Sequence, residues 1–267
     1  MRENLLRTLW QQDAHAVNGW LCLPATFSAE VMAHQGWDSL TIDLQHGLID
    51  YQSAVGMLQA ISTTRTVPLV RVPWLDPAII MKVLDAGAYG VICPMINSAA
   101  ETREFVAACR YPPAGIRSCG PIRANIYAGP DYVANANRTI IAMAMIETRS
   151  GLDNLDEILS VEGLDAVYVG PADLGLALGC EPRLDPTEEE VLKAIEYIVA
   201  RARQKKIVAG IHTASTANAQ KMIRQGFQFV TVGTDVRLLI AKVSEVLKTM
   251  GRGPSAGKVD STQRGPY

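Results

Sequence analysis

Eight short runs rich in Val, Ile and Leu recur along the 267-residue chain, and an amphipathic segment follows each of them. The runs span residues 17–23, 39–44, 67–72, 90–95, 140–146, 166–170, 207–211 and 227–233. Continuous apolar runs of this kind are typical of parallel strands that helices cover on the outside. Eight strand-and-helix units over about 250 residues therefore predict an α/β fold, a (β/α)₈ barrel.

Helix start signals lie between the runs. Ser98 with Glu101, and Thr187 with Glu190, have the spacing of a capping box ahead of an apolar segment. An open, doubly wound sheet is the main alternative fold. Neither a G-x-G-x-x-G after the first run nor a Walker loop occurs in the sequence, which favours the barrel.

The two ends of the chain differ from its middle. Near the amino terminus, apolar residues at helical spacing predict a helix that packs under or against the barrel: Leu5, Leu6, Leu9 and Trp10. We expect residues 1–250 to form one barrel domain that includes this helix. Residues 251–267 are polar and rich in Gly and Pro, so we expect a flexible carboxyl-terminal tail.

Composition excludes several classes of protein. The 25 Lys and Arg residues balance 27 Asp and Glu residues, so the chain has no basic excess for nucleic acid. No apolar run reaches the roughly 18 residues of a membrane span, and the amino terminus lacks the pattern of a signal peptide. Five scattered cysteines without a C-x-x-C pair indicate reduced thiols. We therefore expect a cytoplasmic protein with no nucleic-acid or membrane partner.

Ionisable residues follow several of the predicted strands. Asp43 and His46 follow the second run, Arg71 lies in the third, Glu147 follows the fifth, and Asp173 follows the sixth. The carboxyl ends of all strands in a (β/α)₈ barrel meet on one rim, where such enzymes carry their active sites. The sequence thus predicts that one imidazole, one guanidinium and three carboxylates gather on that rim.

Glu147 and Asp173 are candidate metal ligands. A carboxylate at the end of a buried strand loses hydration, and a cation compensates for that loss. Two carboxylates, with water and substrate completing the shell, suit a hard divalent ion such as Mg²⁺ or Mn²⁺. The alternative is a plain salt bridge between Glu147 and either Arg71 or Arg149.

The other rim residues suggest acid–base and binding roles. A carboxylate near an imidazole fixes its tautomer and raises its basicity, so Asp43 would raise the pKa of His46 above about 6.5. Arg71 has donors that match a carbonyl or carboxylate oxygen. Backbone amides over 170–173 could bind a carboxylate or phosphate oxygen. His212 follows the seventh run but has no carboxylate close in sequence, and we assign it no role.

Several motifs, in this order along the chain, resemble the HpcH/HpaI aldolase family of metal-dependent pyruvate aldolases. The resemblance extends from about residue 19 to residue 247. The motifs that carry it span residues 36–46, 70–73, 84–91, 110–117, 146–148, 154–158 and 169–174. Together they are far more specific than any one of them alone.

The resemblance implies a carbon–carbon lyase that cleaves 4-hydroxy-2-oxo acids reversibly into a 2-oxo acid and an aldehyde. The 2-oxo acid is pyruvate or hydroxypyruvate, and it reacts as an enolate held by Mg²⁺, Mn²⁺ or Co²⁺. The family also implies a homohexamer, in which the last helix can be exchanged between neighbouring subunits. The related citrate-lyase branch offers an alternative function, a lyase acting on CoA thioesters. A barrel without catalytic activity is disfavoured, because all five rim residues are present.

By position, the resemblance assigns a role to each rim residue. Glu147 and Asp173 would bind the metal, and Arg71 would hold the 2-oxo group and stabilise the enolate. His46, oriented by Asp43, would transfer protons through a metal-bound water. The surrounding backbone amides expected to bind the substrate carboxylate are those of Gly170, Ala172 and Asp173.

Three further positions matter in this resemblance. The family counterpart of Asp85 reaches the active site of a neighbouring subunit, so Asp85 would help to close that site. Gln45 replaces a Glu that commonly precedes the histidine, and Met145 replaces a common Gln. Neither replaced residue is a metal ligand, so we expect catalysis to be retained with an altered pocket.

Overall fold

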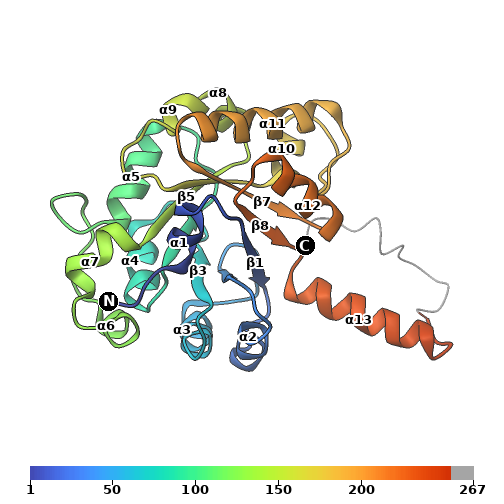
Figure 1. Cartoon of the computed structure of the whole chain (residues 1–267), viewed down its shortest axis with the longest axis horizontal. Helices are drawn as coiled ribbons and strands as arrows, with labels where there is room; N and C mark the ends of the chain where they lie inside the picture. Colours follow the sequence, from blue (N-terminus) through green and yellow to red (C-terminus); the bar gives the residue numbers. More distant parts are fainter. Residues whose placement is uncertain (254–267) are drawn as a thin grey trace.

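Eight parallel strands close into a barrel in the computed structural model, which describes residues 1–253. The strands are β1 (Ala16–Leu21), β2 (Ser39–Asp43), β3 (Val67–Arg71), β4 (Gly90–Cys93), β5 (Ile141–Ile146), β6 (Ala166–Val169), β7 (Val208–Thr213) and β8 (Phe229–Val232). Each strand pairs with the next in sequence, and β8 pairs with β1 to close the sheet (Figure 1). The predicted (β/α)₈ barrel is confirmed.

Helices surround the strands (Figure 1). They are α1 (Leu5–Gln11), α2 (Thr26–Ala33), α3 (Tyr51–Ile61), α4 (Pro77–Asp85), α5 (Ala99–Cys109), α6 (Ile122–Ala128), α7 (Tyr132–Thr139), α8 (Arg149–Asp153), α9 (Leu155–Ile158), α10 (Pro171–Ala177), α11 (Glu189–Gln204), α12 (Thr216–Gln225) and α13 (Asp235–Thr249). Ser98 caps α5 as predicted, because its side chain accepts from the Glu101 amide. The predicted cap at Thr187 is wrong. The backbone stays extended through Glu188, which is the N-cap residue of α11.

A polar layer lies inside the barrel beneath its carboxyl-terminal rim. The Asn18 side chain accepts hydrogen bonds from Ser39 Oγ at 2.8 Å and Thr41 Oγ1 at 3.2 Å. It also donates to Thr231 Oγ1 at 3.0 Å. All four residues are buried. Because their polar atoms pair with one another, the layer ties β1 to β2 and β8 without leaving these groups unsatisfied.

Helix α1 closes the opposite, amino-terminal end of the barrel. Leu6 is fully buried there, and Trp10 Nε1 donates to the carbonyl of Gln228, just before β8. Arg7 Nη2 donates to the carbonyl of Ile140 at 2.8 Å, just before β5. Figure 1 shows α1 lying over the strands near the centre of the molecule. The helix therefore bridges strand starts on different sides of the barrel.

Asp165 collects several cationic and amide donors at this closed end. Its two oxygens accept from Arg7 and Arg110, each at 2.7 Å, and from the Ala142 amide at 2.8 Å. The Arg110 side chain is only 5% exposed and that of Asp165 is 15% exposed. The cluster thus connects α1, the end of α5 and the starts of β5 and β6.

Helix α13 is anchored at its start and then leaves the barrel (Figure 1). Asp235, its first residue, accepts from the amides of Cys22 and Leu23 after β1. Every residue from Leu238 to Met250 is exposed. Of the predicted tail, residues 254–267 lie outside the described residues. None of the helices that the structure describes has both the length and the apolarity to cross a bilayer.

Replacing Asp165 by Ala tests the cluster at the closed end. The change leaves the buried Arg110 without its carboxylate, so we expect the free energy of unfolding to fall by about 3 kcal/mol. Urea denaturation monitored by circular dichroism measures this change. The matched control is Asp156→Ala, which removes an exposed ion pair with Arg201 and should have little effect. Equal effects of the two substitutions would contradict the structural role of Asp165.

Candidate active site

A buried ion pair joins Asp43 and Arg71 at the carboxyl ends of β2 and β3. Arg71 Nε donates to Asp43 Oδ1 at 2.8 Å, and Nη2 donates to Oδ2 at 2.6 Å. The strand register places the two residues side by side. Burial opposes ionisation of Asp43, but the charge and hydrogen bonds of Arg71 outweigh it and lower the pKa of the carboxyl. Asp43 is therefore an anion that fixes the orientation of Arg71.

Two further side chains border the Arg71 guanidinium. It lies over the ring of Trp20, 4.8 Å from the ring centroid, and Trp20 Nε1 donates to Asp43 Oδ2 at 3.2 Å. On another side, the sulfur of Met145 lies 4.0 Å from Nη1. A thioether is a weak acceptor, so Met145 adds little constraint to the guanidinium. Trp20 was not predicted as a site residue. The sequence feature that could have identified Trp20 as a site residue is its position one residue before the end of β1.

Glu147 follows β5 and is 2% exposed. Its Oε1 accepts from the Met95 amide at 2.8 Å, where Met95 has a left-handed backbone with φ of 57°. A Cβ atom at position 170 would lie 2.5 Å from Glu147 Oε2, so only glycine permits this packing. Burial raises the pKa of Glu147 to about 7; the Met95 amide and Arg71 lower it, and the charge of Asp173 raises it further.

The predicted alternative for Glu147, a plain salt bridge, does not form among the described residues. Arg71 pairs with Asp43, and Arg149 pairs with Glu190 at 3.2 Å. Glu147 is thus a desolvated carboxylate near the carboxylate of Asp173, and its environment favours a proton or a cation. A hard divalent cation fits this pair chemically. The structure describes no group of three or more Asp, Glu, His or Cys residues that could hold a metal.

Asp173 lies in the first turn of α10, directly after β6 and Gly170. Pro171 is the first residue of this helix and has no amide hydrogen. The amides of Ala172 and Asp173 lack acceptors within the helix, because the first four amides of any α-helix do. These two amides can therefore donate hydrogen bonds to an anionic ligand at the rim. The three predicted amide positions all belong to this one turn.

His46 lies at the exposed mouth of the site. Its amide, rather than its ring, provides the contact to Asp43 that the structure describes, with N donating to Oδ1 at 3.3 Å. Partial burial lowers the pKa of the imidazole, as does Arg71, whereas Asp43 and Asp173 raise it. The net direction is downward. The predicted increase in the pKa of His46 is therefore wrong, because partial burial and the charge of Arg71 together outweigh the two carboxylates.

Asp85 lies apart from the other predicted residues within one chain. It ends α4, and the chain then enters the amino-terminal end of β4, so Asp85 is at the far end of the barrel from the rim. Its carboxylate accepts from Arg117 Nη2 at 2.6 Å. The role of Asp85 in a neighbouring subunit stays a prediction.

A small cavity at the strand ends is lined by residues from several strands. They are Arg71, Met145, Tyr168, Gly170, Ala172, Asp173, Leu184 and His212. The sequence predicted four of these as site residues, together with His46, Asp43 and Glu147 around them. Tyr168 and His212 were not assigned a role. Both lie inside strands, where a polar side chain in an otherwise apolar run was the available signal.

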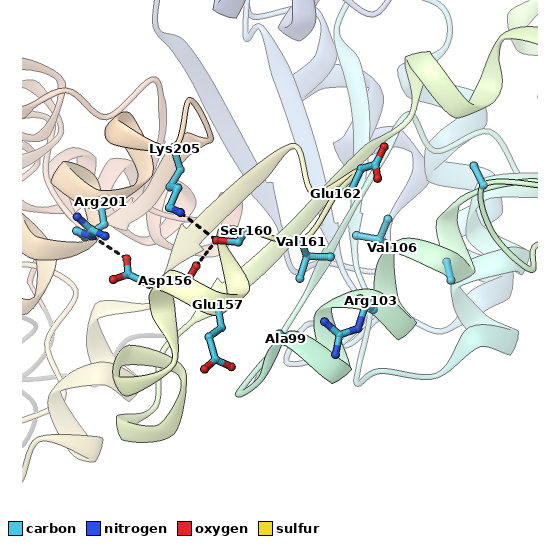
Figure 2. Close-up of a pocket in the computed structure, with 12 residues that line it drawn as sticks. Ala99, Arg103, Val106, Asp156, Glu157, Ser160, Val161, Glu162, Arg201 and Lys205 are labelled. Carbon is cyan, nitrogen blue, oxygen red and sulfur yellow. Dashed lines mark hydrogen bonds and ion pairs between the residues drawn. The ribbon is translucent and has the colours of Figure 1, made fainter.

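A larger depression lies elsewhere, outside the barrel between α5, α9 and α11, with a volume of about 830 Å³ (Figure 2). Three of its charged groups have partners. Arg201 pairs with Asp156 at 2.7 Å, and Lys205 donates to Ser160 Oγ at 3.0 Å. None of the ionisable side chains that line the depression is buried. The chemistry of the molecule is therefore concentrated at the strand ends.

The chain is similar to known proteins over most of its length. It is 43% identical over 244 residues to the hydroxypyruvate/pyruvate aldolase of Rhizorhabdus wittichii, covering 91% of this chain and 97% of that protein. It is 38% identical over 248 residues to a 4-hydroxy-2-oxo-heptane-1,7-dioate aldolase of Escherichia coli, covering 92% and 94% respectively.

Solved structures agree with this relationship. An HpcH/HpaI aldolase/citrate lyase family protein from Burkholderia cenocepacia superposes with a TM-score of 0.87 at 29% identity, covering 93% of this chain and 99% of that one. The family model of HpcH/HpaI aldolase/citrate lyase matches residues 19–241. This match includes every rim residue described above. The chain belongs to the HpcH/HpaI aldolase/citrate lyase family.

Proposed function

We propose that the chain is a divalent-metal-dependent aldolase that cleaves 4-hydroxy-2-oxo acids reversibly into pyruvate or hydroxypyruvate and an aldehyde. The observation that carries this proposal is the buried Glu147 carboxylate, which lies near Asp173 and the oriented cation of Arg71. The two relatives with 43% and 38% identity are both named as aldolases. A lyase for CoA thioesters has no comparable support.

Glu147 and Asp173 would hold the divalent ion, which we propose to be Mg²⁺, Mn²⁺ or Co²⁺. Such an ion stabilises the negative charge that develops on a 2-oxo group when its neighbouring carbon loses a proton. Its positive charge would also keep Glu147 ionised at neutral pH, despite the burial that raises its pKa.

Arg71 would bind the 2-oxo oxygen and stabilise the same developing charge. Because Asp43 holds it by two hydrogen bonds and Trp20 covers one face, the guanidinium needs little rearrangement when substrate binds. The amides of Ala172 and Asp173 would bind the substrate carboxylate at the start of α10. Together these groups would hold the 2-oxo acid at its 2-oxo oxygen and at its carboxylate.

His46 would take a proton from C3 of the 2-oxo acid in the direction of aldol addition and return it in the direction of cleavage. Its exposed position at the mouth suits exchange of this proton with water. The imidazole must be neutral to accept a proton. Because its pKa lies below that of a free histidine, the neutral form predominates at pH 7.

We further propose a homohexamer in which α13 docks on a second copy of the chain. Its exposed apolar residues share one face at helical spacing: Leu239, Ile240, Val243, Val246, Leu247 and Met250. A helix with such a face requires a partner. Beside β1 the barrel exposes Phe27 and Val31 of α2, at 75% and 46%, and these offer an apolar surface to the helix of a neighbour. Such packing would also allow Asp85 to reach a neighbouring site.

Metal removal and substitution of Glu147 test the catalytic proposal. We expect chelation by EDTA to abolish cleavage of a 4-hydroxy-2-oxo acid, and Mg²⁺, Mn²⁺ or Co²⁺ to restore it. Glu147→Gln keeps the shape but removes the charge, so kcat should fall by about 100-fold or more. The control Glu157→Gln alters an exposed carboxylate on the outer face and should leave kcat unchanged. Full activity after exhaustive chelation would refute the metal requirement.

The pH dependence of kcat/KM tests the role of His46. Because the pKa of the imidazole is lowered, the rate should stay level from pH 8 to about 6.5 and decline only below that value. A bound dication would shift the decline in the same direction. His46→Asn should slow the reaction and remove this acidic limb. A decline that begins above pH 7 in the unaltered protein would argue against His46 as the base.

Sedimentation velocity tests the proposed assembly. We expect six copies for the unaltered chain and smaller species for a double variant, Leu239→Lys with Val243→Lys, because two charges would enter the apolar face of α13. Activity should decline with dissociation if Asp85 acts in a neighbouring site. The control Lys248→Ala changes an exposed residue on the opposite, polar side of the helix and should leave six copies. A monomeric unaltered chain would disprove this assembly.

A further inference from the structure

His212 is a buried imidazole with one nitrogen unsatisfied. It lies in β7, is 5% exposed and lines the cavity that also contains Arg71 and Asp173. Its ring meets the ring of Trp20 edge to face at 4.9 Å. Nδ1 lies 3.2 Å from the Tyr168 hydroxyl, but Nε2 has no hydrogen-bond partner among residues 1–253. Buried polar atoms almost always have partners, so an unsatisfied nitrogen beside the substrate site indicates a contact with substrate.

The hydrogen-bond network determines which nitrogen carries the hydrogen. The Tyr168 hydroxyl donates its single hydrogen to Thr231 Oγ1 at 2.7 Å. The contact with His212 therefore requires Nδ1 to be the donor and the hydroxyl oxygen to be the acceptor. Nε2 then carries no hydrogen and presents only a lone pair. Burial, assisted by Arg71, lowers the pKa of His212 to about 3, so the ring is neutral at pH 7 and Nε2 can only accept.

The surroundings of His212 offer it little else to bind. Of the other residues that line the cavity, Met145 and Leu184 have apolar side chains, and the donors of Arg71 and of the Ala172 and Asp173 amides are the groups proposed above to bind the 2-oxo and carboxylate oxygens of the substrate. The missing donor is therefore a hydrogen on the ligand. The methyl group of pyruvate has no such hydrogen, whereas the C3 hydroxyl of a 3-hydroxy-2-oxo acid has one.

We propose that His212 Nε2 accepts a hydrogen bond from the C3 hydroxyl of the 2-oxo acid, which makes the site prefer hydroxypyruvate-type donors to pyruvate. This inference rests on the proposed aldolase function. His212 is then a specificity-determining residue that contacts the substrate without taking part in proton transfer. The C3 hydroxyl keeps its hydrogen throughout, since the proton lost in enolisation comes from the C3 carbon.

The test compares hydroxypyruvate and pyruvate as donors with glyceraldehyde as the fixed acceptor in the presence of Mg²⁺. His212→Phe keeps an aromatic ring but removes the acceptor. We expect kcat/KM for hydroxypyruvate to fall at least about tenfold, the effect of one lost hydrogen bond, and kcat/KM for pyruvate to change by less than about twofold. His212→Gln places an amide oxygen near the position of Nε2 and should recover most of the preference.

Controls separate specificity from a structural role. His34→Phe changes an exposed histidine directly after α2 and should leave kcat/KM unchanged for both donors. Equal losses for both donors in His212→Phe, or an unchanged ratio, would overturn the inference. If that variant does not fold, calorimetry on the unaltered Mg²⁺-loaded protein decides instead: tighter binding of hydroxypyruvate supports the inference, and equal affinities overturn it. Absence of turnover with either donor in the unaltered protein would contradict the aldolase function itself.

Discussion

The arrangement of the rim depends on one carboxylate, that of Asp43. It binds the guanidinium of Arg71 twice, the indole of Trp20 once and the amides of Gln45 and His46. One buried anion thereby connects β1, β2, β3 and the loop that carries the candidate base. A buried charge is tolerated only when its hydrogen-bonding capacity is filled, and removing either partner of such a pair typically destabilises a protein by about 3–5 kcal/mol. The same bonds keep the Arg71 cation in place for substrate.

The barrel and the grouping of the rim residues could be predicted from the sequence, because both follow from chain order. Continuous apolar runs specify buried parallel strands, and every residue that ends a strand in such a barrel lies on the same rim. Glu147 and Asp173 needed no further information to be placed near each other. The fold therefore determines which residues meet, even where their contacts are unknown.

The pairing of side chains on that rim could not be predicted in the same way. Asp43 was expected to orient the ring of His46, yet it binds Arg71, which lies directly opposite in the strand register. That choice depends on which groups are buried together. Burial of His46, with the charge of Arg71, likewise reverses the expected shift in the pKa of the imidazole. Tyr168 and His212 point inward from mid-strand positions, where sequence spacing alone does not distinguish a polar core from a binding surface.

The closure of the amino-terminal end by α1 has a consequence for the order of events in catalysis. Since Leu6, Arg7 and Trp10 close that end, substrates and products would enter and leave at the opposite rim. Arg71 is buried and His46 is exposed, so in the proposed function the 2-oxo acid would occupy the inner position and the aldehyde the outer one. For an aldolase built this way, the 2-oxo acid must enter first during synthesis and leave last during cleavage. The reaction would then follow a compulsory-order kinetic scheme.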